Sequence, residues 1–330
     1  MKVADIGEAG LLQRIFPFCV PTAVGDDAAL LIAQDGYLIA ITTDVLVDGV
    51  HFSELTTSAN DVGWRSITAN LSDLAAMGAM PLGITVGLSL PGSTPVAWVE
   101  ELYAGMKSCV DIYGTGIIGG DVCRSNTISI AITAVGEVPQ NRVIRRRSAL
   151  PGFVIVVTGN HGKSKAGLEL LLNPDLENEL SLMERQHLIT AHQRPRPRLD
   201  VLPLLDWSQP IAGMDSSDGL VDAVTQICLA SGVGAQIDRQ LLPIDRTIYK
   251  LAPKSALEWT LGGGEDFELV LCMPPAAATV LVEQLGAEAA IIGEITQKLE
   301  LVLVDTHNPD FSLSLTNYQQ FQHFGDKLSS

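Results

Sequence analysis

The stretch Asn70-Leu71-Ser72-Asp73-Leu74-Ala75-Ala76-Met77-Gly78-Ala79 places one carboxylate in a segment that is otherwise small and largely apolar. Upstream and within this stretch, apolar residues recur at helical spacing, at Val62, Ile67, Leu71 and Leu74. We predict a helix that is capped by Asp61 and ends at Gly78, with Pro81 just beyond. Asp73 then lies near the C-terminal turn of a largely buried helix, where burial and the helix dipole both disfavour an unpaired carboxylate.

The neighbouring motifs add acids and few bases. They are Gly25-Asp26-Asp27, Thr42-Thr43-Asp44 and Gly119-Gly120-Asp121. Carboxylate oxygens are hard ligands of the kind that Mg²⁺ prefers, and Mg²⁺ commonly bridges protein carboxylates to substrate phosphates. The pattern therefore indicates bound metal.

Length and composition favour two soluble domains. A chain of 330 residues is long for one core, and no apolar run reaches the roughly 18 residues of a membrane span. The start lacks the basic and apolar blocks of a signal peptide, and the five cysteines are scattered without a C-x-x-C pair. We expect a cytoplasmic protein with neither a disulfide framework nor a zinc site.

The net charge of −17 argues against a nucleic-acid partner, because such binding neutralises phosphates with Lys and Arg. A polyphosphate substrate would be repelled unless divalent ions intervened. Solubility alone is an alternative explanation of the charge.

The first half predicts an α+β arrangement. An amphipathic helix is expected within 1–20, a hairpin from strands 28–33 and 37–42, further strands at 83–90 and 128–135, and a helix at 96–113. The hairpin would bring Asp26 and Asp27, before its first strand, to the same rim as Thr42, Thr43 and Asp44 at the end of its second. Arg142, Arg145, Arg146 and Arg147 form a basic cluster between two prolines, read either as solvated surface or as a phosphate contact.

The second half opens with a strand at 153–157 and the loop Thr158-Gly159-Asn160-His161-Gly162-Lys163-Ser164. A P-loop would need glycine at position 157, which is Val, so we reject that interpretation. Helices are expected at 166–172 and 184–193, followed by a Pro- and Arg-rich connector, 194–198, interpreted as a surface link.

Two later motifs resume the acidic pattern. Asp215-Ser216-Ser217-Asp218 precedes a helix, and Gly262-Gly263-Gly264-Glu265-Asp266 precedes a strand. A helix N-terminus favours phosphates, although an ordinary N-cap and a hairpin turn are the simpler alternatives. No covalent nucleophile is evident, and His51 is the one histidine beside the acids. The residues alone predict a Mg²⁺-dependent enzyme that acts on phosphorylated ligands by in-line transfer.

Taken together, the motifs resemble those of the thiamine-monophosphate kinase family, in the same order and over nearly the whole chain. They are 24–29, 42–44 with His51-Phe52, 70–79, 119–121, 215–220, 263–269 and His323-Phe324-Gly325. That family belongs to the superfamily of aminoimidazole ribonucleotide synthetase, selenophosphate synthetase and a hydrogenase maturation factor, whose ATP sites use acids and Mg²⁺ in place of a P-loop.

The resemblance implies a two-domain α+β and α/β (PurM-like) fold. Residues 1–140 would form an ATP- and Mg²⁺-binding domain whose sheet completes a β-barrel across a homodimer, and 141–330 an α/β domain that completes the site. The implied reaction is phosphorylation of thiamine monophosphate by ATP to thiamine diphosphate, directly and on several Mg²⁺ ions.

Residue roles carry over motif by motif. The implied metal ligands are Asp27, Thr42, Thr43, Asp44, Asp73, Asp121, Asp215 and Asp218. The implied ATP contacts are Tyr103, Gly120, Asp121, Arg146 or one of its neighbours, and Ser217. The implied contacts to thiamine monophosphate are His51, Glu265 and Phe321, whose ring suits a cationic heterocycle.

Two departures from the family pattern stand out. Val122 and Cys123 replace two threonines, and Ser216 replaces an aliphatic residue, so we expect modest effects on nucleotide affinity. The alternatives are another ATP-dependent synthetase of the superfamily and a non-catalytic Mg²⁺-nucleotide sensor.

Overall fold

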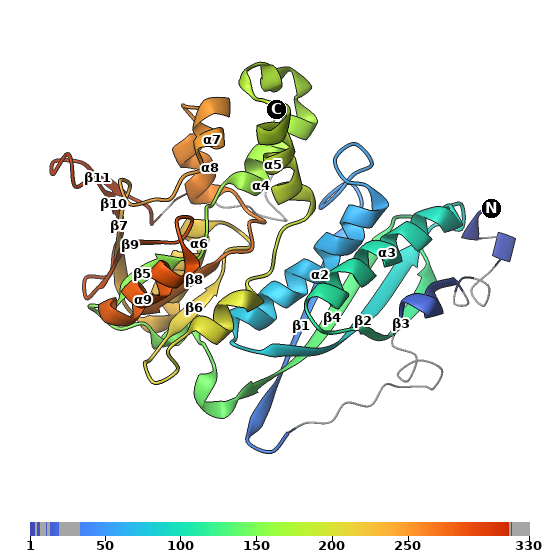
Figure 1. The fold of residues 1–330 in the computed structure, drawn as a ribbon, viewed down its shortest axis with the longest axis horizontal. Coiled ribbons are helices and arrows are strands. Elements are labelled where there is room, and N and C mark those ends of the chain that lie inside the picture. Colours follow the sequence, from blue (N-terminus) through green and yellow to red (C-terminus); the bar gives the residue numbers. More distant parts are fainter. Residues whose placement is uncertain (4, 7–10, 12–13, 20–33, 317, 319–330) are drawn as a thin grey trace.

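The computed structural model describes residues 1–3, 5–6, 11, 14–19, 34–316 and 318. These residues form two sheets in two successive halves of the chain (Figure 1). None of the helices in this part of the chain is long and apolar enough to cross a membrane. The first half contains β1 (Tyr37–Val47), α2 (Ala59–Ala76), β2 (Met80–Leu90), α3 (Val96–Ile112), β3 (Ile117–Arg124) and β4 (Ser129–Pro139).

The second half follows short 3-10 turns at Gln140–Arg142 and Arg146–Ser148. Its strands are β5 (Val154–Val157), β6 (Ala212–Asp215), β7 (Gly234–Asp238), β8 (Leu269–Met273), β9 (Ala290–Thr296), β10 (Leu301–Val304) and β11 (Ser312–Ser314). Its helices are α4 (Lys163–Leu172), α5 (Leu182–Gln193), α6 (Leu220–Ser231), α7 (Arg246–Leu251), α8 (Ala256–Gly262) and α9 (Pro275–Leu285). Other 3-10 turns are Phe16–Phe18, Pro174–Glu179 and Leu199–Leu204.

The first sheet has four strands in the order β1-β4-β2-β3, with β2 and β3 parallel and the other pairs antiparallel. Alternate residues point to opposite faces of a strand. One face buries Ile84, Ile130 and Ile132 under the helices, whereas Ile41 and Val45 are exposed on the other face. The sheet therefore has one helix-covered face and one open, partly apolar face.

Strand β1 corrects one prediction. It continues to Val47, so Thr42, Thr43 and Asp44 lie within the strand and not at its end. The reason is that Val45-Leu46-Val47 extends the β-branched, alternating pattern and pairs with β4 throughout. The proposed hairpin partner, 28–33, lies outside the described residues, as does much of the helix expected within 1–20.

Helix α2, which was predicted as a largely buried helix, runs across the helix-covered face. It ends at Ala76, with Met77 as its C-cap and Gly78 at a φ of 73°. Its N-cap is Ser58 and not Asp61. The Ser58 hydroxyl accepts a hydrogen bond from the Asp61 backbone N–H at 3.2 Å, because Asp61 is already the third helical residue.

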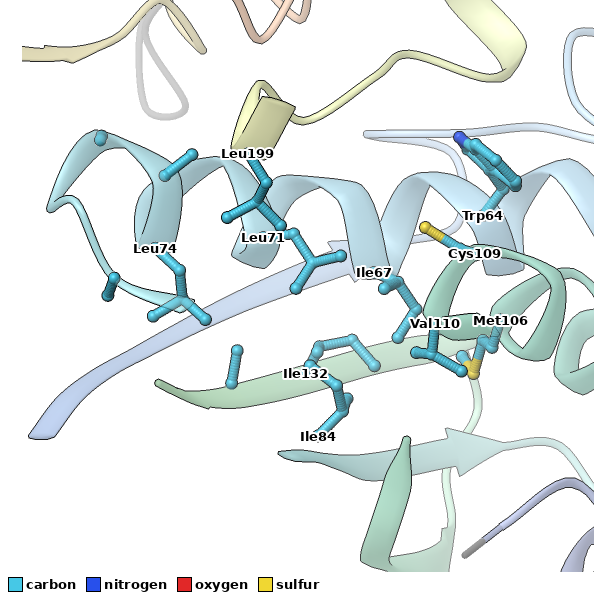
Figure 2. Packing of buried hydrophobic residues seen from close by; sticks show 14 of the residues in the cluster. Trp64, Ile67, Leu71, Leu74, Ile84, Met106, Cys109, Val110, Ile132 and Leu199 are labelled. Atoms are coloured by element: carbon cyan, nitrogen blue, oxygen red, sulfur yellow. The ribbon is translucent and has the colours of Figure 1, made fainter. Parts of the chain in front are cut away.

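Helices α2 and α3 pack backbone against backbone. A Cβ atom added at Gly63 would lie 2.0 Å from the Leu102 carbonyl oxygen, and one added at Gly105 would lie 1.8 Å from that of Asn60. Figure 2 shows the apolar side of α2 against side chains of α3 and of the sheet, with Leu199 packed from the second half of the chain. The position of α2 is thus fixed by both halves.

The second sheet has the order β11-β10-β7-β9-β5-β8-β6. One of its faces packs with α6, while the other, carrying Val156 and Leu271, joins the same core as α2 and α3. The connector 194–198 belongs to this junction, so its interpretation as a surface link was wrong. Trp64 donates its ring N–H to the Pro195 carbonyl at 2.7 Å, and Arg194 Nε lies 2.5 Å from an Asp61 carboxylate oxygen.

Candidate active site

Four side chains from three elements meet where α2 ends against the second sheet. Thr42 and Asp44 project from β1 toward α2, Asp73 from α2, and Asp215 from the end of β6. The Thr42 hydroxyl donates to Asp73, and the neighbouring Ser72 hydroxyl donates to Asp215 at 2.8 Å. The structure therefore brings together acids that are up to 171 residues apart in sequence (Asp44 to Asp215).

These carboxylates repel one another in a desolvated setting. Burial first, then the charges of Asp73 and Asp218, raises the pKa of Asp44 to about 6. Burial and the Asp73 charge likewise raise the pKa of Asp215, and burial raises that of Asp73. Arg146 acts in the opposite direction, lowering the pKa of both Asp73 and Asp215. We call Asp44, Asp73 and Asp215 the acid cluster.

The acid cluster fits a divalent cation by its chemistry. Oδ2 of Asp44 is buried and has no hydrogen-bond partner among the described residues, which is costly for a carboxylate unless a cation binds it. Within the described ranges, no three His, Cys, Asp or Glu side chains are placed so that they could hold a metal ion by themselves. Mg²⁺ does not require such a set, because it usually keeps several waters and takes one or two protein carboxylates together with substrate phosphates.

The loops 215–219 and 262–268 lie against each other beside the acid cluster. The Glu265 backbone N–H donates to the Ser217 carbonyl at 2.7 Å, and a Cβ at Gly264 would come within 2.7 Å of the same oxygen. Glycine at 264 thus permits the close approach. Asp218 is close enough to raise the pKa of Asp44, so the predicted 215–218 motif does reach the acids.

Ser216 does not face this site. Its side chain is buried, its hydroxyl donates to the Glu268 carbonyl at 3.1 Å, and it lies 2.9 Å from His161 Nε2. Burial lowers the pKa of His161 to about 4, so its ring is neutral. The departure at 216 is therefore accommodated by a hydrogen bond in the core, away from the acids.

Glu265 lies in a strained loop and is held by a residue that the sequence analysis missed. Glu265 and Phe267 have φ values of 65° and 54°, the positive-φ residues other than glycine in the described part of the chain. Arg65 of α2 pairs with Glu265 at 2.6 Å, and its side chain is only 2% exposed. A cation within the apolar helical pattern was the available signal, since a buried arginine needs a partner.

The Walker-like loop is filled by the chain itself. The Asp266 carboxylate accepts backbone N–H bonds from Gly162 at 2.5 Å and from Ser164 at 2.8 Å, at the start of α4. These amides are the donors that a phosphate would use at a helix N-terminus. The geometry supports the rejection of a P-loop.

Other predicted residues lie farther from the acid cluster. Gly120 and Asp121 lie on β3, at the opposite edge of the sheet from β1, and the register puts Asp121 in a row with Gly87 and Ala131. Asp121 thus projects from the open face. Thr43 points to that face too, with its hydroxyl 2.8 Å from that of Thr133.

Tyr103 lies in the core of the first half, and His51 lies just after β1. Tyr103 is buried in the core beside Phe18, where burial raises the pKa of its hydroxyl. His51 follows β1, and its Nδ1 accepts the Val47 backbone N–H at 3.0 Å. The remaining predictions, Asp27, Phe321 and the segment 323–325, lie outside the described residues.

Comparisons with known proteins match this architecture. Family models described as the N-terminal and C-terminal domains of AIR synthase related protein match residues 25–138 and 151–305. The chain is 47% identical to a thiamine-monophosphate kinase of Synechococcus elongatus, with 98% of each chain covered.

Solved structures agree. A thiamine-monophosphate kinase of Stenotrophomonas maltophilia superposes with a TM-score of 0.79 at 33% identity, covering 89% of this chain and 95% of that one. A structure described as AaThiL complexed with AMPPCP and TMP superposes with a TM-score of 0.74 at 31% identity, covering 93% and 97%.

Proposed function

Because the chain belongs to the thiamine-monophosphate kinase family, we propose that the acid cluster and the adjoining loops 215–219 and 262–268 are its active site. The protein is an ATP-dependent kinase that converts thiamine monophosphate to thiamine diphosphate, the last step of thiamine diphosphate biosynthesis. The observation that carries the site assignment is the convergence of Asp44, Asp73 and Asp215 from both halves of the chain.

Thr42, Asp44, Asp73, Asp215 and Asp218 would hold Mg²⁺, with Asp27 and Thr43 as further predicted ligands. Bound Mg²⁺ would supply neutralisation of the phosphate charge. The Thr42 and Ser72 hydroxyls orient the carboxylates of Asp73 and Asp215 before substrate arrives, so little reorganisation remains during transfer.

Arg146 and Ser217 are the proposed ATP contacts on this side of the site. Arg146 already acts on the pKa of Asp73 and Asp215, so its guanidinium is near enough to neutralise a phosphate held there. His51 and Glu265, with Phe321, are the proposed contacts to thiamine monophosphate. Because no covalent nucleophile is required, we propose direct in-line transfer, in which positioning and electrostatics provide most of the acceleration.

We also propose that the site is completed in a homodimer, with domains at 1–140 and 141–330. About three strand spacings of about 4.8 Å separate β1 from β3, so Asp121 does not approach the acid cluster of its own chain. The exposed Ile41 and Val45 on the open face favour closure of two sheets into a barrel, which would bury them. Gly120 and Asp121 on β3 would then contribute to the site across the barrel, whereas Tyr103, buried in the core on α3, stays a predicted ATP contact. We propose that the enzyme is cytoplasmic.

A complementation experiment tests this sharing. Asp73→Asn and Asp121→Asn chains are each expected to be inactive, but their mixed dimer would keep one site with both acids and would recover activity. A mixture that stays inactive, despite exchange of subunits, would contradict the shared site.

The central test incubates the protein with ATP, Mg²⁺ and thiamine monophosphate and quantifies ADP and thiamine diphosphate together. Equal amounts of both products, dependent on acceptor and metal, are expected. ADP without thiamine diphosphate would favour a sister synthetase, and ATP binding without either product would favour a nucleotide sensor.

A further inference from the structure

Arg65 lies at the centre of a hydrogen-bond network that crosses the junction of the two halves. Its Nη2 donates to Glu265 Oε1 at 2.6 Å, and its Nη1 lies 2.9 Å from His192 Nε2. His192 Nδ1 in turn lies 3.1 Å from the Ser164 hydroxyl. Apart from Glu265, these side chains are buried.

The directions of these hydrogen bonds follow from the arginine. A guanidinium only donates, so His192 Nε2 must accept, and the ring proton is on Nδ1, which donates to Ser164. Burial and the Arg65 charge lower the pKa of His192 to about 4, which agrees with a neutral ring. His192 therefore fixes one arm of the guanidinium while the other arm holds Glu265.

The network leaves part of Glu265 open. In the ion pair the Glu265 side chain is 36% exposed, whereas that of Arg65 is 2% exposed. Arg65 thus binds one Glu265 carboxylate oxygen from the protein interior, and part of the Glu265 side chain stays exposed to solvent. The left-handed backbone of Glu265, with a φ of 65°, also requires support from its surroundings.

Helix α2 connects this contact to the acid cluster. Arg65 and Asp73 are eight residues apart, which corresponds to about 12 Å along a helix at about 1.5 Å per residue. The same helix therefore places the Arg65 guanidinium against Glu265 and the Asp73 carboxylate in the acid cluster, where the phosphates are proposed to bind. The hydrogen bond from the Glu265 backbone N–H to the Ser217 carbonyl joins the loop 262–268 to the loop 215–219 beside the acid cluster.

We propose that Arg65 is a positioning residue for the acceptor, which orients the Glu265 carboxylate toward thiamine monophosphate and sets its distance from the acid cluster. This inference rests on the proposed function, in which Glu265 contacts the acceptor. His192 and Ser164 hold the arginine in turn.

The test compares Arg65→Gln and Arg65→Lys with the matched control Arg194→Gln. Arg194 also bridges α2 and the second half, through Asp61 and the face of Trp64, but has no contact with Glu265 among the described residues. Steady-state kinetics with each substrate varied gives separate KM values for acceptor and ATP, and thermal unfolding reports the folded fraction.

In Arg65→Gln we expect the KM for thiamine monophosphate to rise by about tenfold or more, with the KM for ATP within about twofold. Arg65→Lys, which keeps the charge but loses the forked geometry, is expected to lie between Arg65→Gln and wild type. Arg194→Gln is expected to lower the thermal midpoint and to leave both KM values within about twofold.

A double variant gives a second readout. Adding Arg65→Gln to Glu265→Gln is expected to change the acceptor KM no further, because Arg65 acts through Glu265. If Arg65→Gln does not fold, Arg65→Lys decides the question through its acceptor KM.

Three results would overturn the inference. They are an unchanged acceptor KM in the folded Arg65 variants, an equal rise in both KM values, and additive effects with Glu265→Gln. A wild-type protein that forms no thiamine diphosphate would instead overturn the proposed function itself, so the two failures are distinguishable.

Discussion

The acid cluster and the loop 158–164 at the start of α4, called the α4 loop below, bury carboxylates in two different ways. Asp266 at the α4 loop accepts two backbone N–H bonds, and Glu268 beside it accepts the Thr158 hydroxyl at 2.7 Å and pairs with Arg198. In the acid cluster, by contrast, Oδ2 of Asp44 has no hydrogen-bond partner in the described part of the chain, and the charges of Asp73 and Asp218 raise the pKa of Asp44.

A raised pKa does not separate the two regions. Burial raises the pKa of Asp266 to about 7, much as it raises that of Asp44 to about 6. The difference is in the donors. Asp266 and Glu268 accept hydrogen bonds from the protein itself, whereas the acid cluster is the place where we propose that Mg²⁺ binds with the substrates.

The largest expected effect comes from Asp73→Asn. We expect the rate of transfer to fall by at least about a hundredfold, because the acid cluster loses its central charge. The thermal midpoint without Mg²⁺ should not fall, since the change also removes repulsion. Asp111→Asn, on the exposed side of α3, is the matched control. Wild-type turnover in Asp73→Asn would remove Asp73 from the site.

Stabilisation by Mg²⁺ and nucleotide should depend on the acid cluster and not on Asp266. For a ligand at a hundred times its Kd, linkage predicts about 2.7 kcal/mol of added stability. We expect this gain, measured by thermal unfolding with Mg²⁺ and a non-hydrolysable ATP analogue, to shrink in Asp44→Asn and to persist in Asp266→Asn. Equal losses in both variants would break the contrast between the two regions.

Asp266→Asn should change stability in a pH-dependent way. The folded-state pKa is raised from 3.8 to about 7, so the contribution of the protonated group is present below 3.8 and is lost as pH rises through about 7. We expect Asn to cost about 1 kcal/mol at pH 5, through a lost acceptor, and less at pH 8. Denaturant unfolding at both pH values measures this, and a gap that widens with pH would contradict it.

The smallest effect is expected at the departures from the family pattern. Cys123 lies on exposed strand β3, with its sulfur 3.0 Å from the Ser89 hydroxyl. Restoring threonine at 122 and 123 should leave turnover within a few fold, because a single neutral hydrogen bond contributes about 1 kcal/mol, which is about fivefold. A large gain in kcat/KM for ATP would show that a hydroxyl here matters.

The sequence predicted correctly those helices and helix ends that depend on residues close together in the chain. The periodicity of α2, the end at Gly78 and the helix α3 were confirmed, because helical spacing and glycine conformation are properties of neighbouring residues. The two-domain fold was confirmed through the family resemblance. Strand β1 was predicted too short, since the functional-looking Thr-Thr-Asp was taken as a strand end when its neighbours continue the strand.

The contacts that sequence reasoning missed join residues far apart in the chain. Glu265 and Arg65 are 200 residues apart, and Ser216 and His161 are 55 apart. No local pattern reports which hydroxyl or guanidinium such a residue will meet after folding. The partners follow only from the way α2 and the two loops pack at the junction.

The two glycines between α2 and α3 have a consequence for variation in this chain. Any side chain at Gly63 or Gly105 would force α2 away from α3, and with it Arg65 and Asp73 together. Substitutions at these positions would therefore mimic active-site lesions although neither glycine lies at the proposed site. A genetic screen for lost thiamine diphosphate synthesis should recover both glycines alongside the acids.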